Sequence, residues 1–277
     1  LSCFLSVRDH DSFFTFSGEV KAVRGVSLKL EHGEILGVVG ESGSGKSITM
    51  LSAMRLLESN GKIVGGNVFF EVEDLMQKSE KAMRRIRNQD IAMVFQDPMT
   101  SLNPTVRVGT QITERIRAYK KNISRSEANA RAVELLRMVK IPEPEKRMHA
   151  YPFELSGGMR QRLMIAIAIS MNPKLLIADE PTTALDVTIQ NQILKLIKNL
   201  RSEIDTSIIL ITHDLGVVAE TCERVVVLYG GKVMEEGLVN EIFYETAHPY
   251  TFGLKAALPR VNQSESDRLY TIPGSPP

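Results

Sequence analysis

The sequence predicts an α/β protein whose sheet is mainly parallel. Five short apolar runs, at residues 35–39, 91–95, 175–178, 207–211 and 225–228, have the length and composition of buried strands. Segments with helical spacing of apolar residues separate most of them, and this alternation is typical of a parallel sheet covered on both faces. Polar residues directly follow the first four runs, and ligands bind in such folds at the carboxyl ends of the strands.

The composition is that of a globular protein without a strong charge. Hydrophobic residues make up 43% of the 277 residues. The chain has 34 lysines and arginines and 33 aspartates and glutamates, which gives a net charge of +1. This balance does not favour a nucleic-acid partner. The two cysteines, Cys3 and Cys222, form no metal or disulfide framework and suit a reducing compartment. Neither a membrane span nor a signal peptide is recognisable, so we expect a cytosolic protein or one that docks on a membrane through partners.

The first 34 residues predict strands. Apolar residues at 5–7, 20–23 and 26–30 lie on either side of a turn at 17–18. Three phenylalanines cluster near that turn. They either pack an edge of the sheet or supply one ring that stacks on the base of a bound nucleotide, for which Phe14 and Phe16 are the candidates.

Residues 40–47 read GESGSGKS and match the phosphate-binding pattern G-x-x-x-x-G-K-[ST]. A predicted strand precedes this loop and a predicted helix, residues 48–57, follows it. Backbone N–H groups and the positive end of the helix dipole therefore converge on one point and attract phosphate oxygens. Glycines let the backbone approach closely, Lys46 is expected to reach the β- and γ-phosphates, and the Ser47 hydroxyl is expected to bind Mg²⁺. The other expected nucleotide contacts in this stretch are Gly40, Ser42, Gly43, Ser44, Gly45 and Ile48.

Beyond the loop, the pattern predicts turns at 60–61 and 65–66, a strand at 68–72 and a solvated basic helix around 81–87. Residues 99–160 predict a helical insertion, with a capping box from Ser124 to Glu127. A Ser-Gly-Gly sequence at 156–158 then leads into an apolar helix over 159–171, and a further helix is predicted over 189–200.

Four strand ends carry side chains suited to hydrolysis of a nucleotide bound with Mg²⁺. Asp179 follows a buried strand and can hold the metal. Glu180 can polarise the attacking water as a general base. Gln96 can contact both metal and water, and His213 can hydrogen-bond the γ-phosphate and detect its loss. Together with Lys46 and Ser47, these residues predict a site that hydrolyses a nucleotide bound with Mg²⁺.

With these residues, the whole chain resembles the ATP-binding subunit of an ABC transporter. The resemblance is carried by the loop at 40–47, Gln96, LSGGMRQ at 155–161, LLIADE at 175–180, TALD at 183–186 and His213. It implies the ABC ATPase fold: a P-loop NTPase core with an N-terminal antiparallel β subdomain at 1–96 and 161–230, a helical signature subdomain at 97–160 and a C-terminal extension at 231–277. FQDPMTSLNP at 95–104, HPYT at 248–251 and IPGSPP at 272–277 resemble the peptide/nickel importer branch.

The resemblance also implies the partners. Two subunits would pack head to tail around two ATP molecules, with Ser156, Gly157 and Gly158 of one subunit contacting the ATP on the other. Two transmembrane permease subunits would insert a short helix near residues 97–104. An extracellular or periplasmic protein would bind the substrate, and the chain would lie at the cytoplasmic face of the membrane.

Several alternatives stay open at this point. Di- or oligopeptides are the first expectation for the cargo, and nickel or a glutathione-like peptide the second. The partner cassette is either a copy of this chain or a paralogue. A DNA-repair ATPase would need coiled coils or a zinc module in the insertion, a translation factor would carry two cassettes, and an inactive regulatory subunit would lack Glu180 and His213. Ile48 stands where Thr is usual, and members of this branch often continue past the position of Pro277.

Overall fold

The computed structural model describes residues 5–15, 18–120, 122–183 and 185–257. The chain divides into two compact units, one made of residues 1–84 and 207–277 and the other of residues 85–206. The domain boundaries expected from the motifs differ from this division and stay a prediction. Within the described residues, no helix combines the length and the apolar character needed to cross a membrane.

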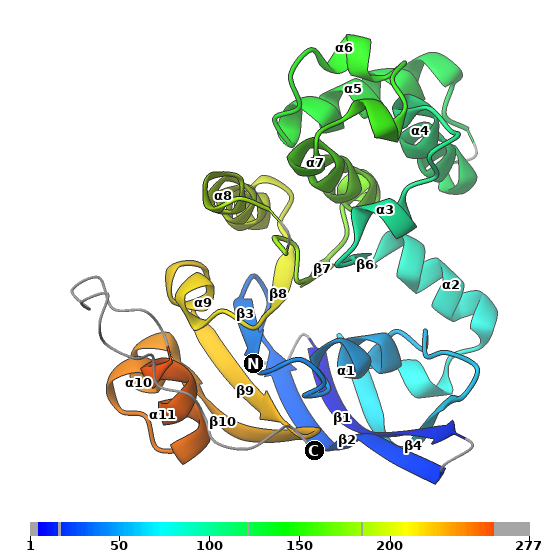
Figure 1. Cartoon of the computed structure of the whole chain (residues 1–277). Coiled ribbons are helices and arrows are strands. Elements are labelled where there is room, and N and C mark those ends of the chain that lie inside the picture. Colours follow the sequence, from blue (N-terminus) through cyan, green and yellow to red (C-terminus); the bar gives the residue numbers. More distant parts are fainter. Residues whose placement is uncertain (1–4, 16–17, 121, 184, 258–277) are drawn as a thin grey trace. The chain divides into compact units, whose positions relative to one another are not determined.

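The first unit contains the antiparallel subdomain expected near the N-terminus (Figure 1). Its strands lie in the order β2-β1-β4-β5, and β1 pairs antiparallel with both β2 and β4. Along β2, buried and exposed residues alternate near the C-terminal end because one face of the strand packs on the core. The bounds are β1 Leu5–Thr15, β2 Gly18–Leu30, β4 Gly61–Phe70 and β5 Glu73–Asp74.

The turn predicted at residues 65–66 was wrong, because β4 runs straight through both glycines. Gly66 has a φ of +117°, and a Cβ there would lie 2.0 Å from the Arg8 carbonyl oxygen. The register against β1 shifts between His10 and Asp11. The pair of glycines therefore serves a β-bulge within a strand rather than a turn. Val72, predicted to end this strand, lies beyond it and is exposed.

The phosphate-loop strand β3 (Ile35–Val39) lies between β8 (Ser207–Thr212) and β9 (Arg224–Tyr229) and is parallel to both. Every residue of β3 and β8 is buried, as the continuous apolar runs predicted. Strand β10 (Lys232–Leu238) pairs antiparallel with β9, so the sheet is mixed. The carboxyl ends of β3 and β8 consequently lie at the same edge.

Among the described residues, four α-helices belong wholly to this first unit, and α2 crosses the boundary between the units. The C-terminal helices bury Ile242 and partly bury Phe243, Tyr250 and Leu254 against Val39 and the strand β9. The segment after β10 is thus part of the core around the phosphate-loop strand. The helices are α1 Lys46–Ala53, α2 Glu80–Gln89, α9 Leu215–Thr221, α10 Val239–Tyr244 and α11 Pro249–Ala256, and a 3-10 turn covers Leu75–Gln77.

The second unit joins two parallel strands, β6 (Ile91–Val94) and β7 (Leu175–Asp179), to the predicted helical insertion. The capping box at the start of α5 is present, since Ser124 Oγ accepts from the Glu127 N–H at 3.1 Å and the Glu127 carboxylate accepts from the Ser124 N–H at 2.8 Å. Helices α4, α5 and α7 pack on one another. The bounds are α3 Pro98–Ser101, α4 Val108–Tyr119, α5 Arg125–Met138, α6 Pro144–Arg147, α7 Gly157–Ala168 and α8 Val187–Glu203, with 3-10 turns at Pro152–Glu154 and Ile169–Met171.

Candidate functional site

The loop after β3 has the backbone of a phosphate cradle. Gly43 and Gly45 have φ angles of +79° and +97°, in the region that glycine adopts without strain. Helix α1 begins at Lys46, directly after Gly45, so its unpaired N–H groups face the loop. Thr49 Oγ1 donates to the Gly45 carbonyl oxygen at 2.8 Å and fixes the entry into the helix. This geometry suits a ligand with several anionic oxygens.

The Lys46 ammonium lies at the centre of this cradle. Its side chain is buried, and Nζ donates to the carbonyl oxygens of Gly40 and Glu41 at 2.8 Å each. The same nitrogen lies 3.5 Å from Ser44 Oγ. The charge is therefore already held at the position where a nucleotide phosphate is expected. Of the remaining predicted contacts, Ser42 and Gly43 are exposed, Ser47 and Ile48 are half-buried, and Ser44 and Gly45 are buried.

Two glycines of the loop are required by packing as well as by the ligand. A Cβ on Gly40 would lie 2.1 Å from the Leu228 carbonyl oxygen, and one on Gly45 would lie 2.8 Å from that of Ala22. The loop is also tied to the turn after β9, where the Gly231 N–H donates to the Ser44 carbonyl oxygen at 3.1 Å. The cradle is thus held from outside by β2 and β9.

Tyr250 is a residue near the cradle that the sequence did not reveal as part of it. Its hydroxyl accepts a hydrogen bond from the Glu41 N–H at 3.3 Å, and its ring lies 4.5 Å from that of Tyr229. The stretch HPYT was noted only as a mark of the importer branch, because nothing in its spacing connects it with residue 41. A long-range contact of this kind has no local sequence signal.

In the second unit, Glu180 follows β7 directly and is held by two side chains. Its Oε2 accepts from Gln96 Nε2 at 3.1 Å and from Thr183 Oγ1 at 2.8 Å. Its φ of +43° lies in the left-handed region, as do those of six other non-glycine residues in the described part of the chain. The neighbouring Asp179 is buried. Two of the predicted catalytic residues, Gln96 and Glu180, are therefore in direct contact.

His213 follows β8 in the first unit, between the strand and helix α9. The side chain is exposed. The next residue, Asp214, caps α9 by accepting from the Gly216 N–H at 2.7 Å, and its own N–H donates to Thr212 Oγ1 at 3.1 Å. These bonds fix the backbone on either side of His213, so the imidazole extends from a rigid corner at the end of the strand.

The signature segment begins helix α7. Ser156 is exposed, and its Oγ caps the helix by accepting from the Met159 N–H at 3.3 Å. Gly157 is exposed as well. At Gly158 a Cβ would lie 2.7 Å from Ile189 Cγ2, so this glycine also permits the close approach of helix α8. The helix start accordingly presents N–H groups outward while packing tightly behind them.

The aromatic candidates and the metal ligands complete the predicted set. Phe14 is 46% exposed, and Lys62 Nζ lies 5.2 Å from its ring centroid. Phe16 lies outside the described residues. No cluster of three or more His, Cys, Asp or Glu side chains that could hold a metal occurs in the described part of the chain. The predicted ligands Ser47, Gln96 and Asp179 carry hydroxyl, amide and carboxylate oxygens, which are donors of the kind that Mg²⁺ takes.

Comparison with known proteins gives matches over nearly the whole chain. Residues 23–183 match the model of the ABC transporter family, and residues 234–277 match the C-terminal region of oligopeptide/dipeptide transporters. The oligopeptide transport ATP-binding protein OppD of Bacillus subtilis is 57% identical over 96% of this chain and 74% of its own length. The dipeptide transport ATP-binding protein DppD of Lactococcus lactis is 50% identical over 97% of this chain and 76% of its own.

Solved structures agree with these matches. The dimeric ATP-binding cassette MJ0796, in a post-hydrolysis state with ADP and phosphate, superposes with a TM-score of 0.76 at 29% identity, over 85% of this chain and 98% of its own. The predicted α/β fold with an antiparallel subdomain and a helical insertion is confirmed. The chain therefore belongs to the ABC transporter family and is an ATP-binding subunit of the oligopeptide/dipeptide type.

Proposed function

We propose that this chain hydrolyses ATP to drive the import of di- or oligopeptides across the cytoplasmic membrane. The observation that carries the proposal is Glu180, a carboxylate placed directly after a buried strand and held by Gln96 and Thr183. A general base must be held in one orientation toward the attacking water, and these two hydrogen bonds hold the Glu180 carboxylate. The names of relatives that are 50–57% identical support the peptide cargo.

Each predicted residue has a defined task in this proposal. Lys46 and the N–H groups of the loop bind the phosphates, and Lys46 exchanges its bonds with the Gly40 and Glu41 carbonyl oxygens for bonds to phosphate oxygens. Glu180 accepts a proton from the attacking water. His213 donates a hydrogen bond to the γ-phosphate and loses that bond after hydrolysis. Phe14 or Phe16 stacks on the base.

Ser47, Gln96 and Asp179 would hold Mg²⁺. Their hydroxyl, amide and carboxylate oxygens are the donors that this ion prefers. Bound there, the ion would neutralise charge that builds up on the phosphate oxygens.

A second ATP-binding subunit, either a copy of this chain or a paralogue, is the proposed partner in the catalytic cycle. Ser156, Gly157 and Gly158 present N–H groups at a helix start, although the chain already has one phosphate cradle. A second phosphate site of this kind has a use if it serves the ATP of another subunit. The dimeric state of the solved cassette supports this arrangement. ATP would then hold two subunits together, and hydrolysis would release them.

Two transmembrane permease subunits and an extracellular or periplasmic substrate-binding protein complete the proposed importer. The chain would lie peripherally at the cytoplasmic face of the membrane, where opening and closing of the cassette pair changes the access of the permease. Nickel and glutathione-like peptides stay as second candidates for the cargo, because the binding protein and permease select it.

The test is uptake by proteoliposomes that contain this chain, its partner cassette and its permease subunits, supplied with the binding protein and internal ATP. Labelled di- and tripeptides, nickel and glutathione are offered in separate reactions. We expect uptake of the peptides, which stops when Glu180→Gln replaces the parent chain. Uptake of nickel alone would contradict the peptide cargo, and undiminished peptide uptake by the variant would contradict the role of Glu180.

A further inference from the structure

Two carboxyl groups lie side by side in the interior of the first unit, between β1 and helix α1. Asp9 and Asp11 of β1 are each 1% exposed, and because they are two residues apart they lie on the same face of the strand. Ser52 of helix α1 donates a hydrogen bond to Asp11 Oδ1 at 2.8 Å. The Oδ2 atoms of both carboxyls are buried without a partner among the described residues. Buried oxygens of this kind are unfavourable unless a donor satisfies them.

The surroundings of the pair are apolar. Its partners across the sheet carry no charge: Val23 and Val26 on β2, and Ile63 and Gly66 on β4. On helix α1, Lys46 donates to carbonyl oxygens of the phosphate loop, at the far end of the helix from Ser52. The other charged side chains of these three strands are exposed: Arg8 and His10 on β1, Glu19, Lys21, Arg24 and Lys29 on β2, and Lys62 on β4. Of these, His10 lowers the pKa of Asp9, but burial has the larger effect.

One proton satisfies this geometry. Shared between the two carboxyls, it removes their mutual repulsion, and Asp11 Oδ1 stays free to accept from Ser52. Burial, together with the neighbouring Asp9, raises the pKa of Asp11 to about 8. The folded chain therefore keeps the proton at neutral pH and releases it as the pH rises through that value.

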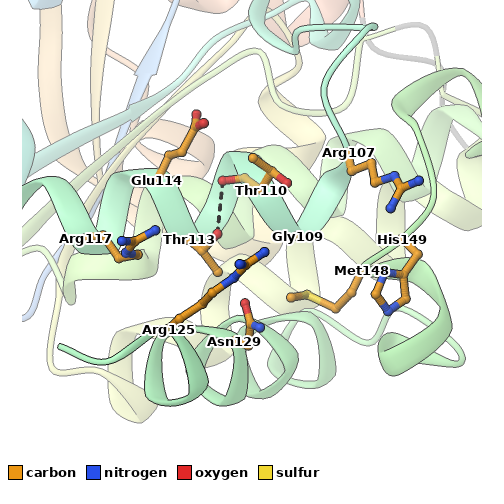
Figure 2. A pocket seen from close by; sticks show the side chains of 10 residues that line it. All are labelled: Arg107, Gly109, Thr110, Thr113, Glu114, Arg117, Arg125, Asn129, Met148 and His149. Atoms are coloured by element: carbon orange, nitrogen blue, oxygen red, sulfur yellow. Dashed lines mark hydrogen bonds between the residues drawn. The ribbon is translucent and has the colours of Figure 1, made fainter.

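A charged cluster of the second unit shows the contrast. Arg107, Arg117 and Arg125 line a hollow of about 280 Å³ together with Glu114, and all four side chains are exposed (Figure 2). Water hydrates such groups, so their charges need no partner from the protein. Asp9 and Asp11 lack this hydration, and ionisation of both would leave two like charges enclosed together.

Two connections lead from the pair to the phosphate loop, and both lie within the first unit. The first is helix α1, which carries Ser52 in its last turn and begins at Lys46, roughly 9 Å away along the helix axis. The second is β2, where Ala22 precedes the residue that pairs with Asp11. The Ala22 carbonyl oxygen would lie only 2.8 Å from a Cβ on Gly45 of the loop. A shift of β1 against α1 would therefore disturb the loop from both sides.

We propose that one proton, shared by Asp9 and Asp11, holds β1 against helix α1 in the arrangement that binds ATP, and that its loss weakens ATP binding. The inference rests on the proposed function, because it concerns the affinity of the same site. Without the proton, two buried carboxylates repel each other, so β1 and the end of α1 separate or admit water. Asp9 and Asp11 are thus positioning residues, which act on the nucleotide through α1 and β2.

The test is the dissociation constant for a non-hydrolysable ATP analogue with Mg²⁺, measured by fluorescence titration of the isolated chain from pH 7 to pH 9. The range lies above the second pKa of a phosphate group, so the nucleotide itself changes its charge little. We expect the dissociation constant of the parent to rise at least about fivefold across the range. Because linkage is reciprocal, calorimetry of the parent at pH 8.5, in buffers that differ in ionisation enthalpy, should show that nucleotide binding takes up protons.

Two variants remove the shared proton without adding charge. Asp11→Asn and Asp9→Asn each leave one amide beside one carboxylate, and the amide N–H takes the place of the proton between them. We expect both to bind as the parent does at pH 7 and to change by less than about twofold up to pH 9. Urea unfolding at pH 7 checks that they fold. Glu114→Gln, which changes an exposed carboxylate of helix α4, should follow the profile of the parent (Figure 2).

Each outcome decides the proposal. A constant that stays level in the parent from pH 7 to pH 9, or binding without proton uptake, would overturn it, and neither result depends on a variant. Constants that rise alike in the parent and in the asparagine variants would overturn it too, because another group would then be titrating. Folded asparagine variants that bind more weakly at every pH, with the slope of the parent, would identify the pair as merely structural. A parent chain that binds no nucleotide at pH 7 would instead contradict the proposed function.

Discussion

The most unusual single residues of the fold are two aspartates buried side by side on strand β1. Asp9 and Asp11 are each 1% exposed, on the same face of the strand. Ser52 of helix α1 donates to Asp11 Oδ1 at 2.8 Å, while the Oδ2 atoms of both carboxyls have no partner among the described residues. Burial, together with the neighbouring Asp9, raises the pKa of Asp11 to about 8, and burial also raises the pKa of Asp9. Protons on this pair therefore stabilise the contact between β1 and the phosphate-loop helix.

This raised pKa makes stability depend on pH. Between pH 4 and 8 the folded chain keeps a proton on Asp11 that the unfolded chain has lost, so the free energy of unfolding falls as the pH rises. Asp11→Asn imitates the protonated form and keeps the bond from Ser52. At pH 8 we expect the free energy of unfolding of the variant, measured with urea, to exceed that of the parent by at least ~2 kcal/mol. At pH 4 the two chains should differ little.

The control for this variant is Asp205→Asn, which changes an exposed aspartate. Its effect on the urea midpoint should be small and the same at both pH values. If Asp11→Asn is less stable than the parent at pH 8, the carboxyl is ionised in the folded protein and the account of the pair is wrong.

Helix α7 begins with two adjacent glycines, Gly157 and Gly158, that differ in how closely other residues pack on them. A Cβ on Gly158 would lie 2.7 Å from Ile189 Cγ2, whereas one on Gly157 would meet only Leu185 Cδ2, at 3.6 Å. The first distance requires α8 or its isoleucine to move, and the second is an ordinary contact. The two positions thus form a matched pair within one helix.

We expect Gly158→Ala to lower the free energy of unfolding by ~1–3 kcal/mol relative to Gly157→Ala. Both variants gain the same helix propensity from alanine, so the difference isolates the steric cost at Ile189. Urea unfolding of the two chains measures it. Equal stability of the two variants would show that Ile189 or helix α8 can move to accept the new Cβ without a loss of folding free energy.

The C-terminal helix α11 supports the phosphate loop through Tyr250. Tyr250→Phe removes the acceptor of the Glu41 N–H and leaves the ring packed beside Tyr229. We expect the dissociation constant for ATP, measured by fluorescence titration, to rise about two- to fivefold, because a single long hydrogen bond contributes little. Tyr244→Phe, at an exposed tyrosine of helix α10, should leave it unchanged. An equal effect of both variants would mean that helix α11 does not support the loop.

For the molecule as a whole, the features that could be predicted from the sequence are those encoded locally. The apolar runs became the buried strands β3, β6, β7, β8 and β9, and the pattern at 40–47 became a glycine-shaped loop before helix α1. Gln96 and Glu180, which were both predicted to follow strand ends, form a hydrogen bond within the second unit.

What could not be predicted depends on contacts between residues far apart in the chain. The strand β4 continues through Gly65 and Gly66 because β1 pairs with it across a bulge, and local rules favour a turn there. Tyr250 meets residue 41 only in the folded chain. Arg115 reads as one more polar position of an amphipathic helix, and only the fold shows that its Nε is enclosed. Burial and long-range partners are properties of the fold, and neither leaves a local sequence signal.

The central claim, hydrolysis of ATP with Glu180 as the general base, is tested most directly by phosphate release from the assembled transporter. The parent chain is compared with Glu180→Gln and with Glu203→Gln, which changes an exposed glutamate at the end of helix α8. We predict that Glu180→Gln binds ATP as the parent does and loses turnover at least ~100-fold, while Glu203→Gln behaves like the parent. Undiminished phosphate release by Glu180→Gln would contradict the account.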